Sequence, residues 1–557
     1  MQKLELTWVG KGNEPSVEPR ILLHDASKDY GDPAANNMLI HGDNLLALKA
    51  LEQEFAGRVK CIYIDPPYNT GSAFEHYDDN LEHSIWLGLM RSRLEILRNL
   101  LSSDGFFACH IDDSEGHYLK VLLDEVFGRN NYQTTLYIRV RYPEKTLKQD
   151  MNFHKEIEQV HIYRKEYGAT PNFDEVVVGF DKFCYYIKDN GDGKTITLGG
   201  KRVDIFQKGQ YSIEVQEGSE FGLKEIWASG TILDGNSSGR FFRDYLTGRA
   251  ETDGLGVLYK VWGIGDDRFD YRYFTGPNRQ NATKGKYYQG VPTAKLDADE
   301  VTKKVAINNF YDLAGSFGNC RSEGNVEFRS GKKPEILLEL ILKHFSNPGD
   351  LVLDSFLGSG TTAAVAHKMG RRYIGIELGD HCYTHCLPRL RSVVDGDPTG
   401  ISSSIGWQGG GGFKFYELAP TLIVKDENGF EIISDKYDAN MLAAAVVKLC
   451  GYRFAPREDN PYIHGVNNVG GFIFVTTQYI TAPLLGEIAK HIPDTQSLVI
   501  CASAFQLGIK NNFPNIKLRK IPQSVLSKCE YGAENYNLNV VELPDFDETE
   551  EDFEDAE

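Results

Sequence analysis

An acidic residue, two prolines and a tyrosine follow one another at Asp65, Pro66, Pro67 and Tyr68. The four residues before them, 61–64, form a short apolar run that is typical of a buried parallel strand. Two prolines can continue neither a helix nor a central strand, so the chain must turn here. The turn places its polar groups at the carboxyl end of the strand, where open α/β sheets bind ligands. The carboxylate and a free carbonyl can accept hydrogen bonds from one amino group, and the ring can stack on a planar heterocycle. A plain β-turn is the alternative.

A glycine-rich loop follows a second apolar run. Residues 354–362 read DSFLGSGTT and lie between a predicted strand and a predicted helix. Glycines allow close approach to the backbone, and a helix start presents free N–H groups. The loop lacks the Lys-Ser/Thr pair of a phosphate-binding loop and is not a GxGxxG fingerprint.

An acidic residue strengthens the interpretation of this loop. It lies 19 positions after the first glycine of the GxG turn, at the end of the next predicted strand. An acid at this place can hold both ribose hydroxyls of a nucleoside cofactor. We therefore predict a cofactor site formed by Asp354, Phe356, Gly358, Gly360, Thr361 and Glu377.

The elements that must position these motifs follow from hydrophobic periodicity. In the first 165 residues, apolar runs alternate with helical patterns, which predicts strands at 38–41, 59–64, 106–111, 135–140 and 159–163 and helices at 45–55, 81–101 and 117–127. The same alternation of helices and strands returns near residue 332, where it predicts a helix at 334–345, a strand at 351–354, a helix at 361–369 and a strand at 373–376. Such alternation predicts a parallel sheet covered by helices on both faces.

Length and composition indicate a globular protein of several domains. At about 150 residues per domain, 557 residues correspond to three or four units. Hydrophobic residues at 41% and charged residues at 25% exclude global disorder and collagen-like repeats. There is no apolar run of the roughly 18 residues that a membrane span needs, and the first residues lack a signal-peptide pattern. Nine scattered cysteines suggest no disulfide framework, so we expect a cytoplasmic protein.

The net charge of −19 is unevenly distributed. Ten acidic residues and no basic one lie in 542–557, which predicts a solvated, disordered tail and leaves −9 on the rest of the chain. Residues 271–296, in contrast, contain five basic residues and no acidic one. Local patches therefore say more about partners than the total charge does.

Between about 166 and 325 the periodicity weakens, while glycines and aromatic residues multiply. Basic side chains alternate there with tyrosines and phenylalanines, which suits contacts to DNA phosphates and base edges. Ordinary solvated charges on a β-rich insert are the alternative. The candidate DNA-binding residues are Arg240, Arg243, Arg272, Arg279, Lys284 and Lys286.

Together, the DPPY motif, the DSFLGSGTT loop and Glu377 resemble the DNA amino-methyltransferases that use S-adenosylmethionine. DPPY precedes the cofactor loop by about 290 residues, an order that resembles the beta class, whose catalytic sheet is circularly permuted. The similarity extends over most of residues 36–418 through the segments GDNLLALKAL, HIDDSE, FRSGKKPE and GGFKFYEL. The nearest resemblance is to the Mod subunit of type III restriction–modification systems.

The resemblance implies methyl transfer to N6 of an adenine that is flipped out of double-stranded DNA. Asp65 and the Pro66 carbonyl would accept hydrogen bonds from the target amino group, and Tyr68 would stack on the base. They would also stabilise the positive charge that develops on the nitrogen. His110 is followed by Asp112 and Asp113, and a histidine with an aspartate could form a catalytic pair. Amino methylation needs no covalent nucleophile, however, so we expect His110 to shape the floor of the site.

The resemblance also adds residues to the cofactor site. Asp43 and Asn44 would contact the adenine region of the cofactor, whereas Lys333 and Pro334 would approach its methionine end. For Asp43, a role as the N-cap of the following helix is the alternative. A cluster of histidines and cysteines at 381–386 has the spacing of metal ligands on one helix face, but no second cluster completes it, so we predict no metal.

The expected fold is a circularly permuted, Rossmann-like α/β methyltransferase sheet with a β-rich target-recognition insert and a C-terminal α/β domain. A chain that begins at the third strand supplies the first two strands late, at 351–354 and 373–377. The predicted domains are a first core part at 1–165, a target-recognition domain at 166–325, a second core part at 326–405, a C-terminal dimerisation or partner domain at 406–541 and an acidic tail at 542–557.

By the same resemblance, we expect a homodimer that binds double-stranded DNA and offers a docking surface to a helicase–nuclease restriction subunit. Two alternatives remain open. One is a solitary adenine methyltransferase, or one from another phage-defence system, and the other is a DNA-recognition subunit with little catalysis. The recognition sequence, and whether one or both strands are methylated, do not follow from the residues.

Overall fold

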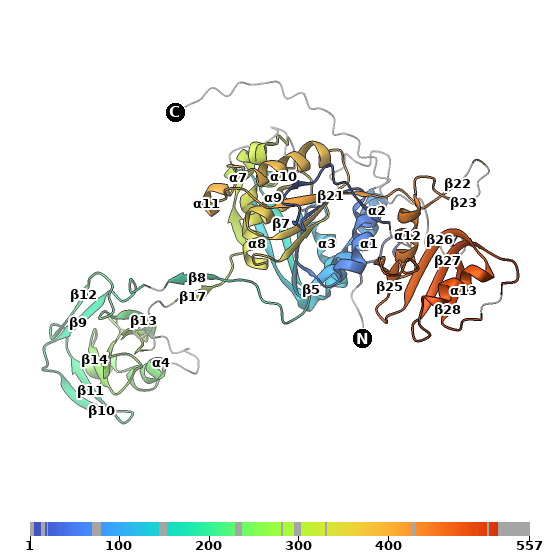
Figure 1. The fold of residues 1–557 in the computed structure, drawn as a ribbon. Coiled ribbons are helices and arrows are strands. Elements are labelled where there is room, and N and C mark those ends of the chain that lie inside the picture. Colours follow the sequence, from blue (N-terminus) through green and yellow to red (C-terminus); the bar gives the residue numbers. More distant parts are fainter. Residues whose placement is uncertain are drawn as a thin grey trace, which may run out of the picture. The chain divides into compact units, whose positions relative to one another are not determined.

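The structure is a computed structural model that describes residues 5–12, 17–18, 20–68, 79–143, 153–177, 179–228, 237–279, 282–293, 302–328, 331–425, 427, 431–509 and 512–521. The chain divides into two compact units (Figure 1). The core unit comprises Met1–Asn172 and Asn308–Glu557, and the insert comprises Phe173–Ile307. The predicted acidic tail lies outside the described residues.

The core unit is built on an 11-stranded mixed sheet. Its central strands, in spatial order, are β3 (Met38–His41), β20 (Arg372–Glu377), β19 (Leu351–Asp354), β4 (Val59–Ile64), β5 (Leu101–Ile111), β7 (Ile157–Arg164) and β6 (Tyr132–Arg139). The strands β19 and β20, which come late in the sequence, lie between β3 and β4 and run parallel to both neighbours. The predicted circular permutation is therefore confirmed.

One strand departs from the predicted parallel arrangement. β7 runs antiparallel to both β5 and β6. It follows β6 as the return strand of an antiparallel pair, which needs no crossover helix, whereas a parallel neighbour would need one. The prediction of an all-parallel sheet is wrong at this strand, and the error matters for the site.

Helices cover both faces of the sheet (Figure 1). On β4, Cys61 and Tyr63 point to one face and Ile62 and Ile64 to the other, as the period of two in a strand requires. The first pair packs in the core cluster that contains α8 (Glu335–Phe345), α9 (Thr361–Lys368) and α10 (Leu387–Val394). The second pair packs in the cluster that contains α1 (Asn44–Phe55), α2 (Asp79–Leu100) and α3 (Gly116–Leu123). Helix α2 ends at Leu100 and β5 begins directly after it, five residues earlier than the strand predicted at 106–111.

The core sheet also contains strands that the sequence did not predict. They are β1 (Leu22–His24), β2 (Tyr30–Gly31), β18 (Phe310–Asp312) and β21 (Gly412–Leu418). β21 runs parallel to β3, with Phe413 and Phe415 buried. The serine- and glycine-rich segment 402–412 holds a short helix, α11 (Ser402–Ile405), and the start of this strand. The boundary predicted at 406 is therefore wrong, because the core continues to residue 418.

The insert is rich in β-strands, as predicted, and the strands of its main sheet pair antiparallel. Its main sheet has the order β10 (Lys194–Leu198), β11 (Lys201–Phe206), β14 (Leu258–Trp262), β15 (Tyr271–Thr275), β16 (Gly285–Gln289) and β13 (Lys224–Ala228). Two further pairs join β9 (Tyr185–Asp189) with β12 (Tyr211–Val215) and β8 (Asp174–Val177) with β17 (Thr302–Val305). The short helices α4 (Ser237–Phe241) and α5 (Ala250–Asp253) lie between β13 and β14 in the chain.

The C-terminal domain has a five-stranded sheet in the order β24 (Arg453–Phe454), β25 (Gly465–Val466), β26 (Phe472–Ile480), β27 (Leu498–Phe505) and β28 (Ile516–Lys520). The last three of these strands run parallel to one another. Its helices are α12 (Ala439–Leu449) and α13 (Ala482–Lys490), and a small hairpin joins β22 (Ile423–Lys425) with β23 (Glu431–Ile433). In the part of the chain that the structure describes, no helix is long and apolar enough to cross a membrane.

Candidate active site

The predicted motifs meet at one edge of the core sheet, where the parallel strands end, which we call the carboxyl edge. In the sheet register, Glu377 at the end of β20 lies beside His41 of β3, and Asp354 at the end of β19 lies beside Gly375. β4 ends at Ile64, directly before Asp65. Parallel strands thus bring together residues that are about 290 positions apart in the sequence.

The DPPY turn is held by contacts on both sides. Asp65 Oδ1 accepts a hydrogen bond from the Tyr68 hydroxyl at 2.8 Å, and its Oδ2 lies 2.9 Å from Lys333 Nζ. Pro66 is buried, and the carbonyl of the exposed Pro67 accepts a hydrogen bond from Trp86 Nε1 at 2.8 Å. The Asp65 carboxylate therefore accepts hydrogen bonds from two donors of the site itself, which a plain surface turn would not provide.

Lys333 lies between two carboxylates. Its Nζ is 2.9 Å from Asp65 and 3.7 Å from Glu158, and 5.0 Å from the centre of the Tyr68 ring. Burial alone would lower the pKa of Lys333, but the two carboxylates outweigh it and raise the pKa above its usual value. Burial likewise opposes ionisation of Glu158, yet Lys333 and His110 lower its pKa to about 2. Both groups are therefore charged at neutral pH.

Glu158 is a residue of this candidate site that the sequence did not reveal. It accepts a hydrogen bond from the Tyr68 hydroxyl at 3.1 Å and lies 2.8 Å from His110 Nε2. The other ring nitrogen of His110 lies 2.8 Å from the Tyr63 hydroxyl. Because β7 is antiparallel, its first residues reach the carboxyl edge; a parallel strand would place them at the opposite edge. His110 is fully buried beneath the turn, where it was expected to shape the floor.

The cofactor loop is fixed by its own polar groups. Asp354 Oδ1 accepts a hydrogen bond from the Phe356 backbone N–H at 2.9 Å, and Oδ2 accepts one from the Thr362 hydroxyl at 2.6 Å. Burial raises the pKa of Asp354 to about 7, and the nearby carboxylates of Asp65 and Glu377 act in the same direction. This aspartate therefore organises the loop from inside the protein.

Glu377 closes the loop from the neighbouring strand. Its Oε2 accepts a hydrogen bond from the Gly358 N–H at 2.7 Å, and its Oε1 lies 2.9 Å from His381 Nε2. Gly358 and Gly360 have φ angles of +57° and +82°, a region that favours glycine. A Cβ added at Gly358 would meet nothing within 4 Å, so this face of the loop is open.

Asp43 and Asn44 connect helix α1 to the same loop. Asp43 caps the helix, because its Oδ1 accepts a hydrogen bond from the Leu46 N–H at 3.0 Å. Asn44 donates to the Ser355 carbonyl at 2.8 Å and accepts from Arg93 Nε at 2.6 Å. The capping role considered for Asp43 is thus present in the structure, and Asn44 supports the loop.

A buried charge cluster below the loop was also not predicted. Glu335, at the start of α8 after Pro334, lies 2.8 Å from Lys368 Nζ and 2.9 Å from Arg389 Nη2, and all three side chains are fully buried. Arg389 also donates to the Thr361 hydroxyl at 2.7 Å, and this hydroxyl donates to the Lys333 carbonyl at 3.1 Å. The cluster therefore ties the helix start of the loop to the segment that carries Lys333.

The candidate DNA-binding residues of the insert differ in exposure. Those at 240, 243, 279 and 284 are exposed. Lys286 is half-buried, 2.7 Å from Glu225 and 4.8 Å from the ring centre of Trp227. Arg272 is only 3% exposed, with its Nη2 2.5 Å from Asp267. Arg272 is therefore a structural residue of the insert, and we correct its assignment.

The histidine and cysteine cluster at 381–386 has other partners. His381 pairs with Glu377, as described above, and Cys382 and Cys386 are buried. Cys386 Sγ lies 3.1 Å from the Gly358 carbonyl. In the described part of the chain, there is no group of three or more histidine, cysteine, aspartate or glutamate side chains that could hold a metal ion.

Comparison with known proteins identifies the family. Residues 59–386, more than half of the chain, match the N6_N4_Mtase family, described as DNA methylase. The chain belongs to this DNA methylase family.

Among individual relatives, it is 33% identical over 420 residues to the "Probable type III restriction-modification enzyme HindVI Mod subunit" of Haemophilus influenzae, an alignment that covers 70% of this chain and 55% of the relative. It is 27% identical over 423 residues to the type III EcoPI Mod subunit of Escherichia phage P1, covering 66% and 61%. The resemblance to Mod subunits is thus confirmed, although the chain spans only about half to two thirds of their length.

A comparison with solved structures includes the PvuII DNA methyltransferase (cytosine-N4-specific). The alignment covers 67% of this chain and 91% of the PvuII chain, at 13% identity and a TM-score of 0.33.

Proposed function

We propose that the protein transfers a methyl group from S-adenosylmethionine to N6 of adenine in double-stranded DNA, as the modification and recognition subunit of a type III-like restriction system. One observation carries the proposal. Asp65 of the DPPY turn, Lys333, and Asp354, Phe356 and Gly358 of the loop line one small cavity of about 30 Å³. An acceptor for an amino group thus lies beside a loop built for a nucleoside.

The loop residues fit S-adenosylmethionine by their chemistry. Glu377 Oε1 accepts the Gly379 N–H and pairs with His381, whereas Oε2 accepts only the Gly358 N–H and keeps a lone pair for a ribose hydroxyl. The outer face of Gly358 is open to a ligand. The enclosed cavity has room for about one water molecule, so the fit rests on these donors, acceptors and open faces. When bound, the cofactor supplies an electrophilic methyl group on a sulfonium.

The target amino group is a poor nucleophile because its lone pair is delocalised into the ring. Hydrogen bonds from this group to Asp65 and to the Pro66 carbonyl would concentrate the lone pair on nitrogen. The same acceptors would stabilise the positive charge that develops during transfer. Flipping the base from the duplex costs a few kcal/mol, and stacking on Tyr68 would offset part of this cost.

Lys333 supports this assignment of the acceptors. Its ammonium donates to Asp65 near the face of the Tyr68 ring, the position that we propose for the target amino group. Lys333 must therefore leave Asp65 when the base enters. Glu158, 3.7 Å away and ionised, offers the ammonium a second partner. We assign Glu158 as a positioning residue that releases Asp65 for the substrate.

Recognition of the target sequence belongs, in this proposal, to the insert. Arg279, Lys284 and Lys286 line one hollow of about 620 Å³ together with Trp227, whose surface is 63% exposed. Cationic side chains suit phosphates, and an exposed aromatic ring suits a base. Arg240 and Arg243 are exposed on a neighbouring segment of the chain and remain in the proposed DNA surface.

The names of the type III Mod relatives also favour a complex with a restriction subunit, and we propose that the C-terminal domain pairs two copies of the chain. A methyltransferase that works without a restriction subunit would have the same site and differ only in this partner. Co-purification with the product of a neighbouring helicase–nuclease gene separates the two forms.

The chemistry is tested by incubating the purified protein with labelled S-adenosylmethionine and duplex DNA and then identifying the methylated nucleoside. We expect label in N6-methyladenine, and none with Asp65→Ala. Label in N4-methylcytosine would contradict the choice of adenine. Absence of transfer by a protein that binds both cofactor and DNA would contradict the activity.

A further inference from the structure

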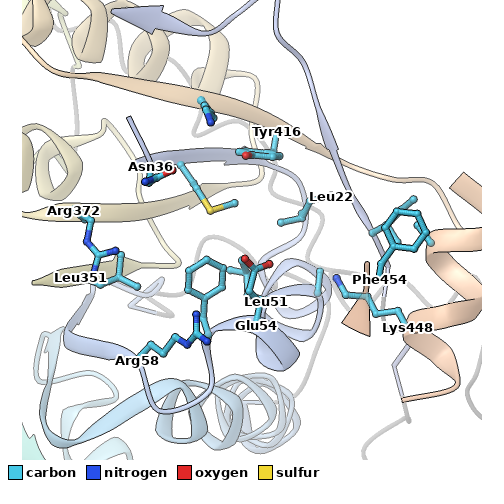
Figure 2. A pocket seen from close by; sticks show the side chains of 16 residues that line it. Leu22, Asn36, Leu51, Glu54, Arg58, Leu351, Arg372, Tyr416, Lys448 and Phe454 are labelled. Atoms are coloured by element: carbon cyan, nitrogen blue, oxygen red, sulfur yellow. The ribbon is translucent and has the colours of Figure 1, made fainter. Parts of the chain in front are cut away.

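A second cavity, of about 430 Å³, lies at the edge of the core sheet opposite the candidate active site. Its lining includes Met38, Leu351 and Arg372, which are the first residues of β3, β19 and β20. The C-terminal domain closes it with Lys448 of α12 and Phe454 of β24 (Figure 2). The cavity is thus separated from the carboxyl edge by the length of these strands.

Positive charge is in excess around this cavity. Its lining contains the four cationic side chains of Arg58, Arg372, Lys414 and Lys448 and one carboxylate, that of Glu54. Figure 2 shows Lys448 extending toward Glu54 from one side, with Arg58 and Arg372 on the other. Within the described ranges, no carboxylate lies within 4.0 Å of any of these four cations. Among the described residues, these four cations therefore have no ion-pair partner, although Arg58 and Arg372 are exposed to solvent and Arg372 Nε donates to the Gly349 carbonyl at 3.1 Å.

Holding the Lys448 ammonium in this cavity has an energetic cost, because burial disfavours its charged form. Its side chain is largely buried, and burial lowers its pKa to about 8, although the carboxylate of Glu54 acts in the opposite direction. Its ammonium has no hydrogen-bond acceptor among the residues that the structure describes. A position in the last turn of α12 favours a cation through the helix dipole. That position does not explain why Arg58, Arg372 and Lys414 converge on the same space from other elements.

The remaining lining suits the uncharged part of a ligand. Leu22, Leu51, Phe55 and Phe454 provide apolar and aromatic surface, and Asn36 and Tyr416 add hydrogen-bonding groups. The volume falls in the range of about 300–1,000 Å³ that is typical of small-molecule sites. A ligand that matches this lining has several negative charges and a planar apolar part.

We propose that this cavity is a binding site for a nucleoside phosphate, with the phosphates on the cationic side chains and the base on the apolar lining. The site is distinct from the proposed cofactor site, which lies at the other edge of the sheet. Because its walls come from both the core and the C-terminal domain, the bound nucleotide would connect the two.

The test measures binding of ATP, ADP, inorganic pyrophosphate and adenosine to the full-length protein by calorimetry at physiological salt. We expect saturable binding of ATP or ADP, with weaker binding of pyrophosphate and of adenosine, because each lacks one half of the ligand. Lys448→Gln and Arg58→Gln should each weaken nucleotide binding by about tenfold or more, since each removes a charge-assisted hydrogen bond. Lys490→Gln, a lysine with 73% side-chain exposure in the same domain, is the matched control and should bind normally.

Three results would overturn the proposal. They are absence of saturable nucleotide binding, unchanged affinity in both charge variants, and pyrophosphate binding as tight as that of ATP. The variant Glu377→Ala separates this cavity from the cofactor site, because it should leave nucleotide binding unchanged. Loss of nucleotide binding in Glu377→Ala would mean that the nucleotide binds in the cofactor site, and would also overturn the proposal. If Lys448→Gln failed to fold, as judged by thermal melting, the test would rest on Arg58→Gln, because Arg58 is exposed and its substitution should not disturb folding.

Discussion

The sharpest prediction concerns Glu158→Gln, which keeps the shape of the side chain and an acceptor for Tyr68 but removes its charge. In the structure, Lys333 lies between Asp65 and Glu158. With glutamine at 158, Lys333 has only Asp65 as a charged partner. The target amino group must then displace the ammonium without a second carboxylate to receive it, so methyl transfer should slow.

The magnitude follows from the pKa of Glu158, which lies at about 2 instead of 4.5. At about 1.4 kcal/mol for each tenfold change in proton affinity, the site favours the carboxylate by about 3 kcal/mol. This is an upper limit for the lost stabilisation, so kcat should fall by about ten- to a hundredfold. A lowered pKa means that the stabilisation is complete above pH 4.5 and is lost only as the pH falls toward 2. The defect should therefore be the same at every pH between 6 and 9.

The assay measures kcat on duplex DNA across this pH range, together with cofactor affinity by calorimetry. Glu158 does not line the loop cavity, so cofactor affinity should change less than threefold. Glu156→Gln is the matched control, because that carboxylate pairs with Arg139, 2.8 Å away, outside the site. A wild-type kcat in Glu158→Gln, or an equal loss of cofactor affinity, would refute the reasoning.

Three further predictions test other parts of the account. Gly358→Asp should abolish S-adenosylmethionine binding in calorimetry, because it strains a φ of +57° and puts a charge beside Glu377; retained affinity would remove the loop from the site. Exchanging residues 173–307 for the equivalent segment of a relative should change the methylated sequence but not the methylated atom, and an unchanged methylome would move recognition elsewhere. Truncation after Pro420 should give a monomeric core in light scattering, whereas truncation after Pro398 also removes β21 and should aggregate; a dimer after the first truncation would contradict the proposed interface.

Much of the site was predictable because its parts follow from parallel-strand geometry. The apolar run before Asp65 and the run before Asp354 each indicated a buried strand, and the order of the motifs indicated permutation. Carboxyl ends of parallel strands share one edge, so proximity of the two motifs followed without coordinates. The long separation in sequence was no obstacle to this inference.

Other features depend on tertiary pairing that periodicity does not encode. The direction of β7 decides at which edge Glu158 lies, and the period-two pattern of an eight-residue strand does not show the direction in which the strand runs. The segment of β21 was recognised as similar to the family, yet its place beside β3 comes from pairing between segments 376 positions apart, as Lys414 and Met38 show. Arg272 and Arg279 look equivalent in sequence, but only the first meets a buried carboxylate, that of Asp267.

The most direct test of the central claim is methylome sequencing of a methylation-deficient host that expresses either the wild-type chain or Asp65→Ala. We predict N6-methyladenine at one specific sequence with the wild type and its complete loss with the variant, while the purified variant still binds S-adenosylmethionine within a few-fold. Methylation of cytosine, or adenine methylation that persists in the variant, would contradict the account.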